Sequence, residues 1–186
     1  MGEPAAKLSY AEYLAFETSS EQKHEFIDGL VLWMAGGSYE HARLAGRVMT
    51  ALARALEGRP CNVVPSDGRV RIEATNRSTY PDVSVVCGRA RFASDDPQAL
   101  TNPIVIVEVL SPTTEQSDRG EKFRHYRRLE SLREYVLVAQ DEPRIEVFRR
   151  EGDVWTFREH GPGERVMLAS IEAVLDVDAI YADPAG

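Results

Sequence analysis

The sequence predicts one domain of the α/β or α+β class, with helices packed against a mixed β-sheet. Its 186 residues slightly exceed an average domain, and 43% of them are hydrophobic, which is enough for one core. The run from Ile104 to Leu110 is apolar and β-branched, which is typical of a strand covered on both faces. A charged helical segment separates it from a second apolar run, Tyr135 to Val138, and this order indicates a parallel βαβ unit.

The elements before this core strand follow from capping, turn and periodicity signals. Ser9 can cap a short helix from Tyr10 to Glu17, and Asp28-Gly29 between apolar residues predicts a hairpin. Residues 39–57 predict an amphipathic helix, because apolar side chains recur at spacings of three and four. Three short strands are expected next, at 61–64, 69–73 and 83–86, the last two separated by a polar connection over 75–79.

The elements after the core strand are a helix and an outer hairpin. Ser111-Pro112 ends the strand, and the charged segment from Thr114 to Leu132 predicts a single helix. Glu151-Gly152-Asp153 joins alternating segments at 144–148 and 154–157, which predicts a hairpin outside the core of the sheet. In the tail we expect only short strands or a turn of helix near Ala179.

The charge of the chain excludes some classes of function. With 22 basic and 30 acidic residues, the formal net charge is -8, which argues against coating nucleic acid or an anionic membrane by bulk attraction. No apolar stretch approaches the roughly 18 residues of a membrane span, so we expect no membrane association and a cytoplasmic location. Cys61 and Cys87 are too few for a disulfide scaffold and lack the spacing of a zinc site, so both are expected to be reduced.

Glu108 is the chemically informative residue, because it is a carboxylate in the middle of an apolar strand. Strand alternation places it on the same side as Ile104, Ile106 and Leu110, near the carboxyl end of the strand. A buried charge costs several kcal/mol unless a partner or a metal ion compensates it. The alternative is a structural Glu paired with an arginine or lying at the rim of the sheet.

Asp82 supplies a second carboxylate at the start of a neighbouring strand, directly after Pro81. A Pro-Asp pair by itself is most often a turn. Together with Glu108, however, it supplies two hard oxygen ligands that could share one divalent cation, Mg²⁺ or Mn²⁺.

The helix after the core strand carries the remaining polar candidates. Asp118, Lys122 and Tyr126 recur every four residues and therefore project from one face. The alternative is an ordinary ion pair between Asp118 and Lys122 on a solvated face. Arginines outnumber acids around this helix and form a local basic patch that could meet nucleic-acid phosphates: Arg119, Arg124, Arg127, Arg128 and Arg133.

Four segments in this order, PDVSVV, PIVIVEVLSPTT, DRGEKFRHY and EYVLV, make the chain similar to the Uma-two family of endonucleases. The similarity runs from HEFIDG near residue 24 to the strand around Phe148. It implies the restriction-endonuclease-like fold of the PD-(D/E)XK superfamily, as one domain over residues 1–186. Its core would cover about residues 24–150, with the N-terminal helix and the C-terminal strands appended.

The resemblance implies catalytic roles for five residues. Asp82 matches the Asp of the PD motif and Glu108 the second acid, so both would bind Mg²⁺ or Mn²⁺. The superfamily's lysine normally follows that Glu by two positions, where this chain has Leu110; in the Uma-two family it lies on the next helix, as Lys122. Glu25 and His41 match further polar positions. Each has a structural alternative, a sheet-edge carboxylate for Glu25 and a helix-start histidine bonded to a loop for His41.

The sequence leaves two functions open. The first is a metal-dependent endonuclease that hydrolyses phosphodiester bonds in DNA, with Arg119, Arg124, Tyr126 and Arg127 meeting the nucleic acid. The second is a catalytically inactive nuclease-fold module that binds nucleic acid or protein. Lys122 favours the first and Leu110 the second, whereas a purely structural domain would leave Glu108 unexplained. The outer hairpin over 144–157 could also pair across a two-fold axis in a homodimer.

Overall fold

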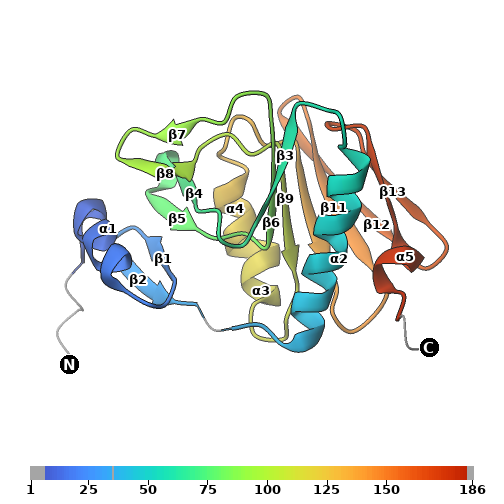
Figure 1. Ribbon diagram of the computed structural model, residues 1–186, viewed down its shortest axis with the longest axis horizontal. Coiled ribbons are helices and arrows are strands. Elements are labelled where there is room, and N and C mark those ends of the chain that lie inside the picture. The colour runs from blue at the N-terminus through green and yellow to red at the C-terminus, as the bar shows by residue number, and fades with distance from the viewer. Residues whose placement is uncertain (1–6, 35, 184–186) are drawn as a thin grey trace.

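The computed structural model describes residues 7–34 and 36–183 and contains two six-stranded sheets and a two-stranded ribbon (Figure 1). The central sheet, sheet B, has the strand order β12-β11-β10-β9-β6-β3. Strands β9 and β10 are parallel and the other pairs are antiparallel, which confirms the βαβ unit and the mixed sheet. The strands of sheet B are β3 (Cys61–Pro65), β6 (Val83–Cys87), β9 (Val105–Val109), β10 (Glu134–Val138), β11 (Ile145–Glu151) and β12 (Val154–His160).

A second sheet, sheet A, was not foreseen. Its strand order is β2-β1-β5-β4-β8-β7, and the polar run expected to be a loop at 75–79 contains its buried strand β5 (Arg77–Thr79). That expectation is wrong because the polar side chains of β5 find partners inside the molecule, as described below. The other strands of sheet A are β1 (His24–Ile27), β2 (Leu30–Trp33), β4 (Val70–Ile72), β7 (Phe92–Ala93) and β8 (Asp96–Leu100).

Sheet B is covered on both faces. On one face lie α2 (Tyr39–Ala55), the ribbon of β13 (Arg165–Leu168) and β14 (Ala173–Asp176), and α5 (Val177–Tyr181). The predicted apolar stripe of α2, Leu44, Val48 and Leu52, is fully buried there. On the other face, side chains of β9 and β10 pack with α4 (Phe123–Tyr126) and with Val70 and Ile72 of sheet A. Ile106 and Leu110 face this second core, as alternation predicts, whereas Ile104 packs against the first.

The predicted N-terminal elements are confirmed. Helix α1 (Tyr10–Ser19) is capped by Ser9, whose side chain accepts the Glu12 N–H. The Glu12 carboxylate in turn accepts the Ser9 backbone N–H. Asp28 and Gly29 form the turn between β1 and β2, with φ angles of 46° and 96° that suit a two-residue hairpin. Figure 1 shows α1 and this hairpin at one end of the molecule.

The helix after β9 is shorter and less regular than predicted. It consists of α3 (Glu115–Ser117), a π-helical turn, η2 (Asp118–Lys122), and α4 (Phe123–Tyr126), and the chain then continues as turns. The predicted end at Leu132 is wrong, because Leu129 and Leu132 are buried within these turns, which lead the chain back to β10. A π-turn adds a residue to the helix and is frequent at functional sites.

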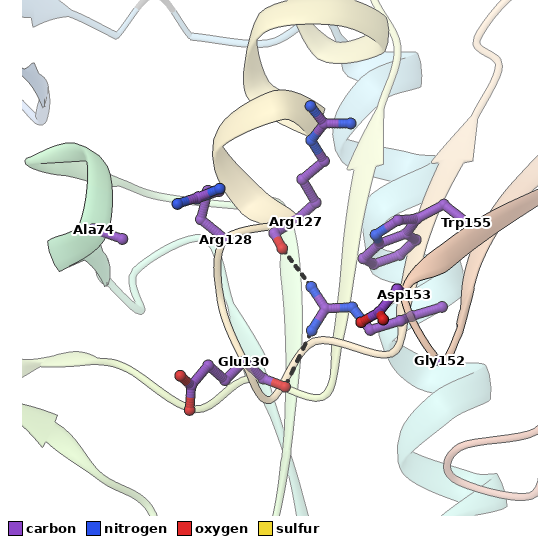
Figure 2. Close-up of a pocket in the computed structure, with 8 residues that line it drawn as sticks. Ala74, Arg127, Arg128, Glu130, Gly152, Asp153 and Trp155 are labelled. Carbon is purple, nitrogen blue, oxygen red and sulfur yellow. Dashed lines mark hydrogen bonds between the residues drawn. The ribbon is translucent and has the colours of Figure 1, made fainter.

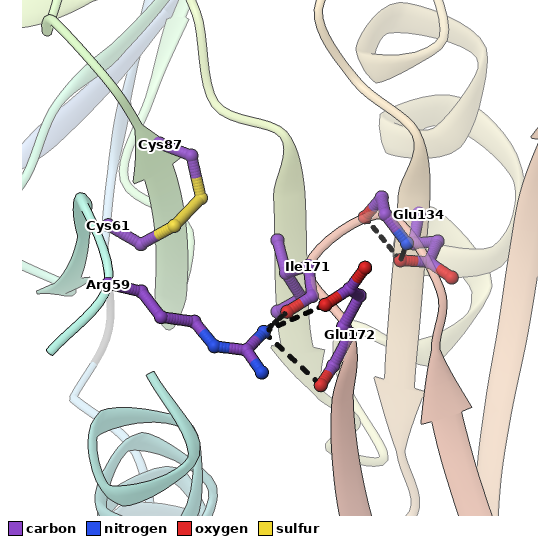
Figure 3. The surroundings of a disulfide bond; sticks show 7 residues. Arg59, Cys61, Cys87, Glu134, Ile171 and Glu172 are labelled. Carbon is purple, nitrogen blue, oxygen red and sulfur yellow. Dashed lines mark hydrogen bonds and ion pairs between the residues drawn. A yellow bond between two sulfur atoms is a disulfide. The ribbon is translucent and has the colours of Figure 1, made fainter. Parts of the chain in front are cut away.

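Cys61 and Cys87 form a disulfide, so the expectation of two reduced thiols is wrong (Figure 3). The cause is the antiparallel register of β3 and β6, which places the two residues opposite each other with their Cα atoms 4.0 Å apart. Register is a property of the tertiary fold, which the spacing of two cysteines does not reveal. Beside the bond, Arg59 Nη1 donates to the carbonyl of Ile171 at 2.7 Å and ties the start of β3 to the C-terminal ribbon.

Within the described ranges, none of the helices has the length and apolar character needed to cross a bilayer.

Candidate active site

Asp82 and Glu108 meet at the ends of adjoining strands of sheet B. The antiparallel register pairs Val83 of β6 with Val107 of β9, and one further step along it sets Asp82 across from Glu108. Asp82 is held in place because its Oδ2 accepts the backbone N–H of Val109 at 2.7 Å. The strand after Pro81 therefore delivers a carboxylate to the carboxyl end of β9, as the sequence predicts.

Glu108 is almost completely buried, with a side chain 4% exposed. Its Oε1 accepts a hydrogen bond from the Tyr126 hydroxyl at 2.7 Å and lies 3.3 Å from Lys122 Nζ. Burial raises the pKa of Glu108 to about 8; the positive charge of Lys122 opposes this rise and the negative charge of Asp82 adds to it. The two carboxylates are thus near enough to repel each other, and a cation placed between them would relieve that repulsion.

Lys122 reaches Glu108 from the π-turn and lies 2.8 Å from a carboxylate oxygen of Asp118. Burial alone would lower the pKa of Lys122, but the carboxylates of Glu108, Glu25 and Asp118 raise it well above the ordinary lysine value. The side chain is therefore a fixed ammonium group, suited to donate hydrogen bonds and stabilise negative charge. It is only 13% exposed, so the ordinary surface ion pair considered above does not describe it.

His41 lies in the first turn of α2, with its Nε2 3.2 Å from Asp82 Oδ2. The hydrogen bond to Asp82 raises the pKa of His41, against the opposing effect of burial, and the backbone of Val109 contributes in the same direction. Ser38 caps the helix and accepts the His41 N–H at 3.1 Å. Gly37 leaves room for the ring, because a Cβ at Gly37 would lie 2.7 Å from His41 Nδ1.

Glu25 reaches the site through sheet A and is buried, contrary to the alternative of a water-facing carboxylate. Its Oε1 accepts the Thr79 hydroxyl, and Thr79 Oγ1 lies 3.4 Å from the hydroxyl of Tyr126, which in turn donates to Glu108. The Thr79 and Tyr126 hydroxyls therefore lie against each other, each donating its proton to a different carboxylate, and this contact brings Glu25 of sheet A close to Glu108 of sheet B. The Tyr126 hydroxyl is committed to Glu108 and is not available to a phosphate.

Two residues of this network, Arg77 and Thr79, were missed by sequence reasoning. Arg77 is 2% exposed and bridges Glu25 at 3.0 Å and Glu121 at 3.1 Å. The available signal was the position of Arg77-Ser78-Thr79 shortly before Asp82, where a strand can lead into the Pro-Asp turn. The polar character of those residues hid it, because buried strands are recognised by apolar residues.

The arginines that were expected to contact nucleic acid lie in different surroundings. Arg119 is neutralised by Glu115 at 2.8 Å and by Glu146 of β11, so its guanidinium is occupied by carboxylates. Arg124 is exposed, and Arg127 lies at the far end of α4 beside a separate cavity (Figure 2). The structure therefore gathers Asp82, Glu108, Lys122, His41 and Glu25 into one site but does not gather the arginines there.

The site suits a hard divalent cation that keeps most of its water. Among the residues that the structure describes, Asp82 Oδ1 and Glu108 Oε2 accept no hydrogen bond, which leaves one oxygen of each carboxylate available. Over the same residues there is no cluster of three or more His, Cys, Asp or Glu side chains arranged around a metal position. Two carboxylates, with the remaining ligands from water and substrate phosphate, are the typical set for Mg²⁺.

A mixed sheet flanked by helices, with two strand-end carboxylates and a lysine beside them, places the protein in the restriction-endonuclease-like class. The family model Uma2, described as "Putative restriction endonuclease", matches residues 10–178. The chain therefore belongs to the Uma2 family, and the resemblance stated from its sequence motifs is confirmed.

Two relatives and a solved structure match most of the chain. "Uncharacterized protein slr1290" of Synechocystis sp. (strain ATCC 27184 / PCC 6803 / Kazusa) is 38% identical over 179 residues, 96% of this chain and 93% of its own. "Uncharacterized protein sll1609" of the same organism is 36% identical over 146 residues, 78% of this chain and 82% of its own. The crystal structure of "a putative nuclease belonging to DUF820" from Anabaena variabilis ATCC 29413 has a TM-score of 0.74 at 17% identity. The match covers 96% of this chain and 98% of that chain. This last likeness establishes the fold.

Proposed function

We propose that the protein is a metal-dependent endonuclease that hydrolyses phosphodiester bonds in DNA. The observation that carries the proposal is the meeting of Asp82, Glu108 and Lys122, which lie far apart in the chain and come together at one end of sheet B. Family membership supports a nuclease, since the Uma2 model is described as a restriction endonuclease.

Asp82 and Glu108 would hold the cation, Mg²⁺ or Mn²⁺, through their available oxygens. When bound, such an ion polarises the phosphate and lowers the pKa of a coordinated water. Lys122 donates hydrogen bonds to the attacking water or to a phosphate oxygen and stabilises the negative charge that develops there. It does not act as the proton acceptor, because the surrounding carboxylates keep it protonated.

The remaining groups position these three. The Tyr126 hydroxyl, which lies against Thr79, fixes the orientation of the Glu108 carboxylate, and His41 fixes that of Asp82. Leu110, which occupies the usual lysine position, is buried in the core between the two sheets. Lys122 of η2 contacts Glu108 Oε1, the oxygen that also accepts the Tyr126 hydroxyl. This contact supports the view that the lysine has moved to the helix and still reaches the carboxylate.

The decisive test separates metal binding from cleavage. Wild-type protein should cleave plasmid DNA with Mg²⁺ or Mn²⁺, and Mn²⁺ should raise its melting temperature by binding linkage. Asp82→Asn should lose both properties. Lys122→Ala should keep the melting shift and lose cleavage by about 10²-fold or more, a typical cost of removing one charge-stabilising donor.

Lys7→Ala is the matched control, because Lys7 is exposed and, among the residues that the structure describes, its one ion pair is with the surface residue Asp28. Its cleavage rate should equal that of wild type. If a cleaving wild type were unaffected by Lys122→Ala, the assignment of the helix lysine would be wrong. If DNA binding persisted without cleavage at any metal concentration, the inactive-module function would replace this proposal.

A symmetric homodimer would allow cleavage of both strands, and the free edge strand β12 is the surface we propose for it. Val154 and Phe157 on this strand are 63% and 52% exposed. Pairing of two β12 edges across a two-fold axis would cover these side chains and continue the ladder of sheet B. Light scattering after size exclusion would decide, because a monomer at micromolar concentration would rule the arrangement out.

A further inference from the structure

Arginines at the end of α4 surround a cavity of about 500 Å³, at the end of sheet B opposite the carboxylates. Arg127 and Arg128 directly follow α4, and Arg150 of β11 and Trp155 of β12 belong to one hairpin. Figure 2 shows Arg127, Arg128 and Trp155 around the cavity. Arg133 lines an adjoining hollow that shares Arg150. We call these five residues the arginine cleft.

The positive charge of the arginine cleft is not neutralised by direct ion pairs. Among the described residues, none of its four arginines forms an ion pair with a carboxylate, whereas Arg69, Arg119 and Arg144 each do. Two acids, Glu130 and Asp153, also line the cavity, so four arginines and two acids line the two adjoining hollows together. On a protein of net charge -8 this is a local exception, of the kind that a polyanion partner requires.

Two of the four guanidinium groups are held rigidly by uncharged partners. Arg150 donates to the backbone carbonyls of Glu130, at 3.2 Å, and of Arg127, and its guanidinium lies 4.8 Å from the centre of the Trp155 ring. Arg133 donates to the carbonyl of Glu130 at 2.8 Å. Carbonyls fix these side chains without cancelling their charge, so little side-chain entropy remains to be lost when an anion binds.

Burial, followed by the nearby charge of Arg133, lowers the pKa of Arg150 below the usual arginine value. The like charges therefore repel each other in the free protein. An anion in the cleft would remove this repulsion, and a phosphate oxygen is the acceptor that guanidinium groups match best in geometry.

The cleft begins where the helical segment that carries Lys122 ends, because Arg127 is the residue that directly follows α4. From Lys122 to Arg127 this segment advances by about 7.5 Å at 1.5 Å per residue. Successive phosphates of one strand are spaced by about 3.4 Å along a duplex axis, so the cleft begins about two nucleotides from Lys122. The exposed Arg124 lies between the two on the same helix.

We propose that the arginine cleft binds backbone phosphates of the DNA strand that flanks the cleaved bond. The identity of the ligand as DNA rests on the proposed nuclease function, whereas the anion-binding character rests on the cleft itself. The cleft would bind phosphate groups only, so it contributes affinity and register but no sequence preference.

The test measures DNA binding without cleavage. A fluorescein-labelled DNA duplex is titrated with full-length protein in EDTA, and its anisotropy is followed at several salt concentrations from about 50 to about 200 mM. Arg127→Ala/Arg128→Ala should weaken binding about tenfold or more and reduce the slope of log K against log salt by about 1 to 2, near 0.9 for each phosphate that is no longer neutralised. Arg150 is kept, because it fastens the hairpin to the helix.

The matched control is Arg54→Ala/Arg89→Ala, which removes two exposed arginines that form no ion pair within the described ranges. This pair should change affinity less than about threefold and leave the salt slope unchanged. Equal losses of DNA affinity in the two double variants would show that the arginine cleft does not bind DNA, even if the wild type cleaves DNA. A wild type that never cleaves, with binding that still depends on Arg127 and Arg128, would refute the nuclease proposal and leave the cleft in place.

Competition identifies the source of the phosphate. Inorganic phosphate or a mononucleotide at millimolar concentration should not displace the duplex, because a single phosphate engages only part of the cleft. Displacement of the duplex from wild type, but not from Arg127→Ala/Arg128→Ala, would show that the cleft is a site for a small phosphate ligand and would overturn the assignment to DNA.

Discussion

Glu108 is the residue at which stability and function oppose each other. Its carboxylate is buried, repelled by Asp82 and only partly compensated by Lys122 and Tyr126. The folded protein therefore holds a proton on Glu108 more tightly than the unfolded chain does. A residue that costs stability in the free protein, and would recover that cost when a cation binds, has the expected property of a metal ligand.

Glu108→Gln should therefore stabilise the metal-free protein at neutral pH. The pKa of Glu108 rises from an ordinary value of 4.5 to about 8 on folding, so the free energy of unfolding of wild type falls as pH increases across this window. The variant should lack this decline and be more stable by on the order of 4 kcal/mol near pH 8, with little difference below pH 4.5. Denaturant unfolding in EDTA across this pH range measures it.

Glu57→Gln, at an exposed position after α2, is the control for this measurement and should follow wild type at every pH. The Tyr126 hydrogen bond survives in Glu108→Gln because the amide oxygen still accepts it. A pH profile of Glu108→Gln parallel to that of wild type would show that Glu108 does not hold the proton.

At the scale of elements, the site depends on where helices and strands begin. The start of α2 places His41 against Asp82, and the π-turn after α3 lets both Lys122 and Tyr126 reach one oxygen of Glu108. The amphipathic pattern predicts the body of α2, and the alternation of β9 predicts the face of Glu108. The π-turn has no comparable sequence signal, because a run such as Asp118 to Tyr126 is compatible with an ordinary α-helix.

A pair of glycine substitutions tests the start of α2. Gly37→Ala should displace the His41 ring, because the new Cβ would lie 2.7 Å from Nδ1, and should lower the cleavage rate while the protein remains folded. Gly46→Ala, in the middle of the same helix, meets nothing within 4 Å and should stabilise the protein by up to about 1 kcal/mol without loss of cleavage. Melting temperature and plasmid cleavage are measured for both; equal activities would show that His41 does not position Asp82.

At the scale of the whole molecule, the site lies where the two sheets meet. Glu25 and Thr79 belong to sheet A and Glu108 belongs to sheet B, and Tyr126 joins them. Anything that separates the sheets should therefore disturb the Glu108 carboxylate. The disulfide supports this arrangement, because it closes the segment of chain that runs from β3 through β4 and β5 to β6.

Reduction of the disulfide should lower stability. A loop with a sequence separation of 26 residues corresponds to about 3 kcal/mol of lost unfolded-state entropy. Dithiothreitol should lower the melting temperature of wild type accordingly and have no effect on Cys61→Ala/Cys87→Ala. A thiol assay on the unreduced, denatured protein should detect no free cysteine; two free thiols and an unchanged melting temperature would contradict the bond.

Local sequence determined most of the individual elements. The Ser9 cap, the Asp28-Gly29 turn and the apolar run of β9 each depend on residues close together in the chain, so their physical chemistry is visible without a fold. The anomaly of Glu108 is visible for the same reason, since a charge among β-branched residues stands out by itself. The order of the sequence motifs further predicted Asp82 as the acid of the PD motif and Lys122 as the lysine on the following helix.

The tertiary structure alone decided which residues lie opposite each other across the strands and between the sheets. The register of β3 on β6 sets Cys61 against Cys87, and the burial of β5 turns Arg77 and Thr79 from apparent loop residues into parts of the site. Polar residues can form a buried strand only when partners from other segments satisfy them, and those partners are distant in sequence. Local patterns therefore specify elements, whereas the pairing of distant charges depends on strand register and on the packing of the two sheets against each other.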